Sequence, residues 1–242
     1  MQNQVVSREE WRMARGALIA KEKAFTRAGD ALGAEQRALP WVKIDKEYVF
    51  EGPSGKLTLS DLFDGRSQLF IKMFMLDPGQ VRQCTGCSLE VDHVAGLLEH
   101  LQNNDVTYAV VAPAPIAEIE AMRQRMDWRF PWVSCGMGEF YRDVYLTFNP
   151  EGVTSTGNVV FYKDDDGQIF HTYSSYSRGC EGYLGIYRIF DVMPKGRNEN
   201  GPYHAMGDWV RPRNMYGKGG MVTRNGQYHP QGCGCGIHAE AS

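Results

Sequence analysis

The sequence contains no run of about 18 apolar residues, which is the length that a membrane-spanning helix needs. Residues 1–10 carry neither the basic segment nor the apolar segment of a secretory signal. Six cysteines in 242 residues are too sparse for a secreted, disulfide-rich scaffold. We therefore expect a cytoplasmic protein that does not enter a membrane.

The chain also lacks an excess of positive charge. Its 26 basic and 29 acidic residues give a net charge of −3, so no basic surface argues for nucleic acid as a partner. The hydrophobic share of 43% and the charged share of 23% are those of an ordinary globular protein. This length and composition fit one large domain, or one domain with substantial extensions.

The sequence contains one C-x-x-C motif, Cys84-Thr85-Gly86-Cys87, whose position between predicted elements indicates a function. The pair lies between an apolar run, 69–76, and a helical pattern, 88–101. A strand that delivers C-x-x-C to the first turn of a helix and leads on to a second strand is the thioredoxin-type redox arrangement. Cysteines three apart share one helix face, so the two sulfurs can be either dithiol or disulfide.

The position of Cys84 at the start of a helix favours its thiolate, because unsatisfied N–H groups and the positive end of the helix dipole lie there. Arg82 adds a nearby positive charge. We expect Cys84 to be reachable by solvent and to attack, and Cys87 to resolve the mixed disulfide. Two other interpretations stay open: half of a zinc site, and a pair of inert buried thiols.

The rest of the chain predicts an α/β fold. Ser7 and Glu10 form a capping-box pattern that begins an amphipathic helix, which we expect to end at Gly29 and Gly33. Strand and helix patterns then alternate with short links, which implies parallel strands with right-handed crossovers. The segments concerned are a hairpin within 46–63, strands at 69–76 and 106–111, helices at 88–101 and 116–126, a third strand near 128–136, and a hairpin at 159–173.

Two further side chains are candidates for supporting roles. Lys72 interrupts the apolar run 69–76; it is a candidate for holding a thiolate, but a lysine in such a place more often extends to the surface. His171 lies near Tyr173, Tyr176 and Arg178, and a histidine there has the chemistry to assist proton transfer during exchange. A purely structural strand histidine is the equal alternative.

Several segments together resemble the DUF899 family: Cys84–Ser88, 106–111, 128–132, 166–174 and 194–197. The resemblance covers roughly residues 7–216, and Cys84 and Cys87 fall on the C-x-x-C of that family. It implies a thioredoxin-like three-layer sandwich with a central mixed β-sheet, and dithiol-disulfide oxidoreductase activity. The P-x-x-x-T-x-x-C signature of peroxiredoxins is absent around Pro78 and Cys84, so a thiol peroxidase is the less favoured reading.

We expect three parts along the chain: an N-terminal helical extension at 1–40, the thioredoxin-like domain at 41–200, and an irregular C-terminal extension at 201–242. The last part ends in a glycine-rich segment with two cysteines and two histidines, His229, Cys233, Cys235 and His238. Four such side chains are a ligand set for zinc or copper. The alternatives are a disordered tail, and a tail that relays a disulfide from the main site.

The sequence therefore predicts an enzyme that exchanges thiols and disulfides without a cofactor. Its partners are a protein or small-molecule disulfide and an unidentified electron donor, and a homodimer is an open option. The rival prediction, from another class, is a non-catalytic metal-binding protein that uses the tail.

Overall fold

The computed structural model describes residues 3–80, 83–146, 156–197, 210–222 and 227–229. The chain divides into two compact units, Met1–Trp41 and Val42–Ser242. Among the described residues, no helix is long and apolar enough to cross a membrane.

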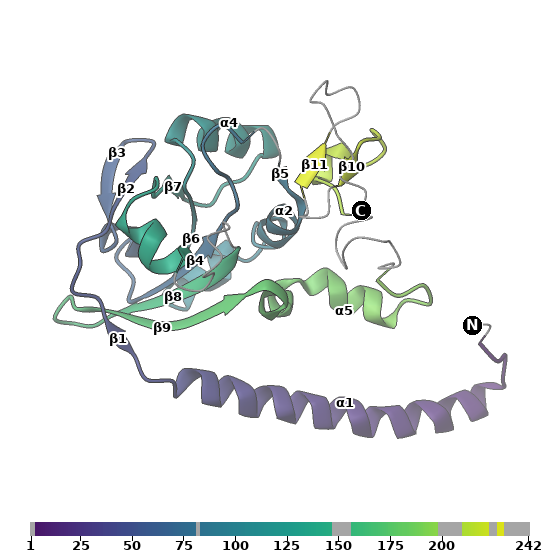
Figure 1. Cartoon of the computed structure of the whole chain (residues 1–242). Helices are drawn as coiled ribbons and strands as arrows, with labels where there is room; N and C mark the ends of the chain where they lie inside the picture. The colour runs from purple at the N-terminus through teal and green to yellow at the C-terminus, as the bar shows by residue number, and fades with distance from the viewer. Residues whose placement is uncertain (1–2, 81–82, 147–155, 198–209, 223–226, 230–242) are drawn as a thin grey trace. The chain divides into compact units, whose positions relative to one another are not determined.

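The first unit is built on one long helix, α1 (Arg8–Arg37; Figure 1). Its predicted capping box is confirmed: the Glu10 N–H donates to the Ser7 hydroxyl, and the Ser7 N–H donates to the Glu10 carboxylate. The prediction that Gly29 and Gly33 end the helix is wrong. A glycine inside a helix costs only about 1 kcal/mol, and a helix-favouring alanine lies next to each of the two positions, so the helix continues to Arg37.

The second unit is organised around a mixed sheet with the order β1-β9-β8-β4-β6-β7-β2-β3. Strand β4 (Gln68–Met73) lies at its centre, parallel to β6 (Val106–Ala112) and antiparallel to β8 (Gly157–Lys163). The other strands are β1 (Val42–Lys43), β2 (Val49–Gly52), β3 (Gly55–Thr58), β7 (Trp132–Ser134) and β9 (Ile169–Tyr176).

The helices follow the predicted alternation with one correction. Helices α2 (Thr85–Asp92) and α3 (Leu98–Asn103) lie between β4 and β6, α4 (Ile116–Met126) lies between β6 and β7, and α5 (Gly185–Val192) follows β9. The continuous helix expected over 88–101 is wrong, because the chain turns at 93–97 between α2 and α3. Apolar residues on both sides of that turn keep the helical spacing, so the pattern alone did not reveal the break.

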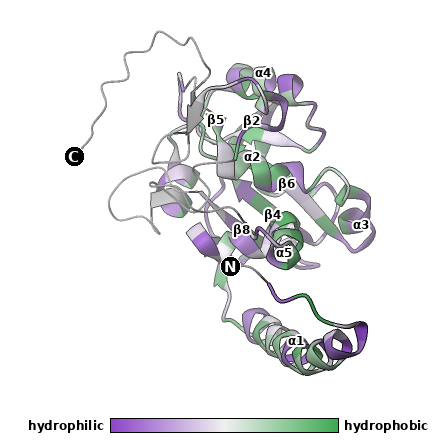
Figure 2. Ribbon diagram, turned by 90° about the vertical axis from the view of Figure 1, so that its right-hand side faces the viewer, coloured by the Kyte–Doolittle hydropathy of each residue, from purple (hydrophilic) through white to green (hydrophobic). Residues whose placement is uncertain are grey.

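Each face of the sheet has its own core. On one face Leu69, Ile71 and Met73 of β4 pack with aromatic residues that include Phe63 and Phe140. On the other face the core joins Phe74, Val110 and Trp132 to helices α2 and α4, and it includes Cys84 and Cys87. Figure 2 shows hydrophobic colouring on β4 at the centre of the unit. The result is a central mixed sheet covered on both sides, as a thioredoxin-like sandwich requires.

A second, small sheet completes the unit. Strand β5 (Gln83–Cys84) pairs with β11 (Gln227–His229), which pairs in turn with β10 (Met221–Val222). Both pairings are antiparallel, and Gln227 lies opposite Cys84. A segment from the end of the chain therefore lies directly beside the cysteine motif.

Candidate functional site

The two cysteines of the C-x-x-C motif meet at the amino end of α2. Cys84 is the N-cap residue of that helix and its sulfur accepts a hydrogen bond from the Cys87 N–H, at 3.3 Å. The two Sγ atoms lie 2.7 Å apart. The Ser88 hydroxyl donates to the Cys84 carbonyl at 2.6 Å, which fixes the turn that carries the pair.

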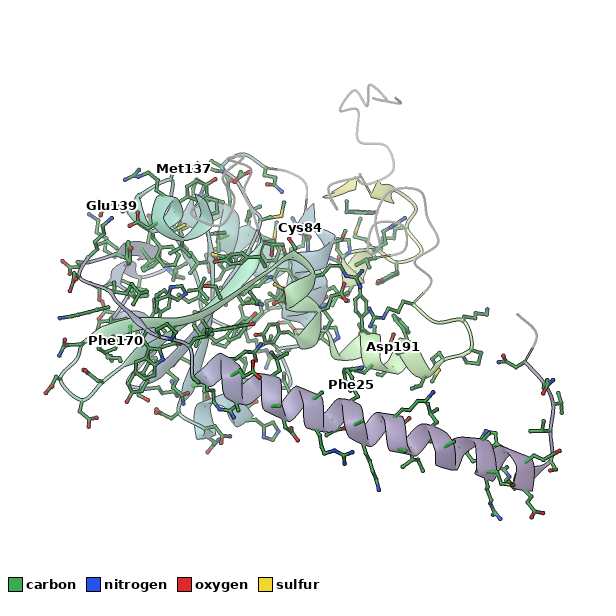
Figure 3. The ribbon with its side chains drawn as sticks, turned by 60° about the horizontal axis from the view of Figure 1, so that its bottom comes forward. Phe25, Cys84, Met137, Glu139, Phe170 and Asp191 are labelled. Atoms are coloured by element: carbon green, nitrogen blue, oxygen red, sulfur yellow. The ribbon has the colours of Figure 1, made fainter. Side chains whose placement is uncertain are left out.

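The pair is more deeply buried than the sequence analysis expects. Cys84 is 4% exposed and Cys87 is 1% exposed, and both belong to the core under α2. The expectation that solvent reaches Cys84 is therefore wrong for this conformation. Figure 3 labels Cys84 within the packed side chains. The reason is the short strand β5, which turns the motif inward between the helix and the C-terminal hairpin.

A buried ion pair lies in the same core. Lys72 is 0% exposed, and its Nζ lies 2.5 Å from Oε2 of Glu90, which is on α2. Extension of Lys72 to the surface, the more common outcome for such a lysine, is therefore wrong. Burial would lower the pKa of Lys72, but the charges of Glu90, Cys87 and Cys180 outweigh that effect and raise it. Lys72 is thus a fixed positive charge beneath the cysteines.

Thr156 also contacts the pair, at Cys87 Sγ. Its hydroxyl lies 3.3 Å from Cys87 Sγ and 3.1 Å from the carbonyl of Met73, the last residue of β4. Thr156 directly precedes β8, where Gly157 lies so close to Ser175 that a Cβ would be 2.6 Å from the Ser175 carbonyl. Glycine lets the strands approach there and so sets the place of the threonine.

These neighbouring residues shift the pKa values of the two cysteines, which titrate together as one pair. Burial would raise the pKa of Cys87, but hydrogen bonds with Cys84 and Thr156 and from the Met75 N–H, together with the charge of Lys72, lower it to about 7. The hydrogen bond with Cys87 and burial raise the pKa of Cys84 well above its usual value. Two sulfurs this close share one proton, so the pair loses its first proton near neutral pH and holds its second strongly.

This arrangement differs from the expectation that the helix terminus, with the charge of Arg82 nearby, activates Cys84. The stabilised negative charge belongs to the shared pair and is centred on Cys87, because Lys72 and Thr156 act there. Sequence reasoning missed Glu90 and Thr156 altogether as site residues. The one available signal was the lysine within the apolar run 69–76, since a buried lysine needs an acidic partner.

Among the remaining sequence candidates, His171 lies away from the cysteines. His171 is on β9, opposite Phe161, whereas the cysteines adjoin the Gly157 end of β8, roughly 13 Å away along that strand. Its Nε2 bonds to Ser174 Oγ at 2.7 Å, and burial lowers its pKa. Arg82, Cys233, Cys235 and His238 lie outside the described residues, as does the side chain of His229.

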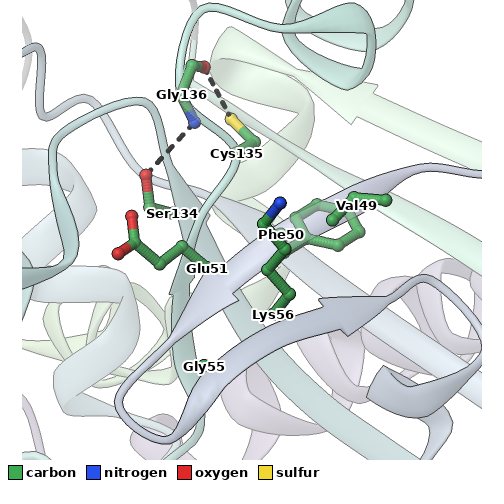
Figure 4. Close-up of a pocket in the computed structure, with 8 residues that line it drawn as sticks. All are labelled: Val49, Phe50, Glu51, Gly55, Lys56, Ser134, Cys135 and Gly136. Atoms are coloured by element: carbon green, nitrogen blue, oxygen red, sulfur yellow. Dashed lines mark hydrogen bonds between the residues drawn. The ribbon is translucent and has the colours of Figure 1, made fainter.

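A second thiol lines a separate pocket on the other side of the sheet. The pocket has a volume of about 390 Å³, and Cys135 lies in it with Glu51, Lys56 and Ser134 (Figure 4). The Cys135 thiol bonds to the Gly136 carbonyl at 3.3 Å. Burial raises the pKa of Cys135 to about 12, so this thiol stays protonated at neutral pH and serves as an internal control.

No group of three or more His, Cys, Asp or Glu side chains that could hold a metal occurs within the described ranges. The predicted tail site therefore remains a prediction from sequence.

The pair gives a pH prediction. Thiolate absorbance in the ultraviolet should rise with pH with its first midpoint near 7, because the lowered pKa belongs to the pair. In the double variant Lys72→Met with Glu90→Gln, this midpoint should move up by about one unit or more, since the stabilising positive charge is gone. At pH 7 that change means about tenfold less thiolate. An unchanged midpoint in the double variant would show that Lys72 does not lower the pKa of the pair. As a control, the Cys135→Ser variant should titrate with the same midpoint as the parent chain.

The fold and this site define a thioredoxin-like α/β protein with a buried dithiol beside an ion pair. The chain belongs to the DUF899 family, described as bacterial proteins of unknown function, whose model matches residues 1–216. The resemblance seen in the sequence is therefore confirmed. No curated protein matches the chain.

Several solved structures match the chain at low sequence identity. A putative protein disulfide isomerase from Bacteroides thetaiotaomicron has a TM-score of 0.42 and 17% identity, over 62% of this chain and 88% of that one. A thiol:disulfide interchange protein from Bacteroides sp. has a TM-score of 0.40 and 13% identity, over 64% and 93%. Peroxidoxin BcpB from Mycobacterium tuberculosis has a TM-score of 0.38 and 13% identity, over 60% and 93%. Likeness at this level does not bear on activity, which depends on the site.

Proposed function

We propose that this protein is a thiol-disulfide oxidoreductase in which Cys84 and Cys87 alternate between dithiol and disulfide. The observation that carries the proposal is the pair itself: two sulfurs 2.7 Å apart at a helix amino end, with a first pKa of about 7. A thiolate is the nucleophile in disulfide exchange, and a pair in this state supplies one at neutral pH.

The first step uses the shared proton. Cys84 passes its proton to the Cys87 thiolate, 2.7 Å away, as the Cys84 sulfur attacks the substrate disulfide. A Cys84–substrate bond forms, the substrate S–S bond breaks, and the second substrate sulfur leaves as a thiolate that takes up a proton. Both thiols are buried in this conformation, and we assign the attack to Cys84 because it is the less deeply buried of the two, 4% exposed against 1%, and lies at the N-cap and on the edge strand β5.

The second step uses the buried charge. Cys87 loses its proton and attacks Cys84 Sγ, which closes the internal disulfide and releases the first substrate sulfur as a thiol. Lys72 and Thr156 stabilise the Cys87 thiolate that this step needs. Overall one substrate disulfide becomes two thiols, and the protein dithiol becomes one disulfide. The residues of the site need no cofactor for this chemistry.

A stoichiometric titration tests the proposal. Reduced protein receives one equivalent of a small-molecule disulfide, is quenched in acid, and is alkylated and mapped by mass spectrometry. We expect Cys84 and Cys87 to become protected together, while Cys135 stays alkylatable after unfolding. Protection of Cys135 in their place, or a pair that stays reduced in excess disulfide, would refute the proposal.

A further inference from the structure

Several positively charged side chains lie near the cysteine motif, and the proposed exchange reaction makes no use of them. Over the whole chain acidic residues outnumber basic ones, 29 to 26. The described C-terminal residues, 210–222 and 227–229, reverse this balance, because they contain Arg211, Arg213 and Lys218 but no Asp or Glu. These residues include β11, the strand that lies beside Cys84.

A further arginine, Arg125 on α4, is connected to the cysteine turn by a chain of hydrogen bonds (Figure 1). Its guanidinium donates to Gln83 Oε1 at 3.1 Å, and the amide of Gln83 donates to the Ser88 hydroxyl at 2.8 Å. That hydroxyl donates to the Cys84 carbonyl at 2.6 Å. Gln83 and Ser88 are buried, whereas Arg125 is exposed. Among the described residues its partner is the neutral Gln83 amide, which leaves the charge of Arg125 uncompensated.

Two arginines of the C-terminal segment approach the same motif. The guanidinium of Arg211 lies 6.0 Å from the centre of the Tyr228 ring, and Tyr228 pairs with Gln83 in the ladder between β11 and β5. Arg213 lies 3.5 Å from Asp92 Oδ1, at the C-terminal end of α2. Asp92 compensates part of the charge of Arg213, so this arginine contributes less to the local excess of positive charge.

This local charge matters for the choice of substrate. The reduced pair holds a thiolate at neutral pH because the pKa of Cys87 is lowered to about 7, and a thiolate repels a negatively charged disulfide. Lys72 does not offset that repulsion, since it is buried and already paired with Glu90. Exposed arginines can offset it, because a guanidinium binds a carboxylate through two parallel hydrogen bonds.

We propose that the substrate of this site is a small disulfide that carries carboxylate groups close to its sulfurs, and that Arg125 and Arg211 bind those carboxylates. A small molecule fits better than a protein disulfide because both cysteines are almost fully buried. This inference rests on the proposed function, which supplies the reaction with Cys84 and Cys87, and it leaves the steps of that reaction unchanged. The two arginines determine specificity and exchange neither protons nor sulfur.

Three small disulfides of different charge test the inference: dithiodiglycolate is negative, 2-hydroxyethyl disulfide is neutral and cystamine is positive. Each oxidises the reduced protein, samples are quenched in acid and alkylated, and loss of the Cys84–Cys87 dithiol gives a rate constant. Dividing it by the rate constant of the same disulfide with 2-mercaptoethanol removes differences in intrinsic reactivity. At low salt we expect the negative disulfide to react about tenfold faster than the neutral one, and the positive disulfide to react slowest.

In the variant Arg125→Gln with Arg211→Gln, the ratio of the negative to the neutral rate constant should fall to about one. The matched control, Lys43→Gln with Lys56→Gln, removes two exposed positive charges from the edge strands β1 and β3 and should keep the ratio of the parent chain. The ratio compares two disulfides on one protein preparation, so a partial loss of folded protein in a variant does not change it.

Two results would overturn the inference: a neutral disulfide that oxidises the parent chain as fast as the negative one, or an arginine double variant that keeps the preference of the parent chain. Both leave the proposed function standing, because the neutral disulfide still oxidises Cys84 and Cys87. If none of the three disulfides oxidises the pair, the proposed function fails and the inference fails with it.

Discussion

The Cys84→Ser chain is expected to lose reduction of a model disulfide completely, whereas the Cys87→Ser chain should hold the substrate as a mixed disulfide on Cys84. A serine hydroxyl is not ionised at neutral pH and forms no S–S bond, so the first variant cannot begin the reaction. The second can begin it but lacks the sulfur that resolves it. The measurement is reduction of insulin under turnover, followed by intact mass under non-reducing conditions.

The control for this comparison is Cys135→Ser, which removes a thiol whose pKa is raised to about 12 by burial and which lies on the other face of the sheet. It should keep the activity of the parent chain. Substrate trapped on Cys87 in the Cys84→Ser chain would contradict the assignment of the attack to Cys84. Equal activity in all three variants would contradict the proposed function itself.

The Lys72→Met variant should lose about 3–5 kcal/mol of unfolding free energy, because it leaves the Glu90 carboxylate buried without its partner. That loss is a large part of the roughly 5–15 kcal/mol that stabilises a typical domain. Adding Glu90→Gln should restore most of the stability, since the second change removes the unpaired charge. Urea unfolding followed by fluorescence measures each difference.

A surface ion pair of similar geometry provides the matched control. Lys46 Nζ lies 2.6 Å from Asp143 Oδ2, but the two side chains are 52% and 32% exposed. Lys46→Met should therefore cost no more than about 1 kcal/mol. If Lys72→Met loses no more unfolding free energy than Lys46→Met, the Glu90 carboxylate does not need Lys72 as its buried partner. The double variant would then restore no stability.

The capping box of α1 was predictable because it depends on residues three apart. The break between α2 and α3 was not, because both helices keep the apolar spacing of one longer helix. His171 was a candidate for proton transfer because of its neighbours in sequence, yet its place on β9 depends on pairing with β8, and that register leaves it away from the cysteines.

By itself the sequence determined where the candidate dithiol lies and which local elements carry it: a strand, a C-x-x-C turn and a helix, each specified by neighbouring residues. Only the tertiary structure decided the environment of the two sulfurs. Lys72, Thr156 and Gln227 come to the motif from separate strands or their ends, and their approach depends on sheet order and packing. Charge, burial and access are properties of that assembled core, so no local pattern in the chain could have specified them.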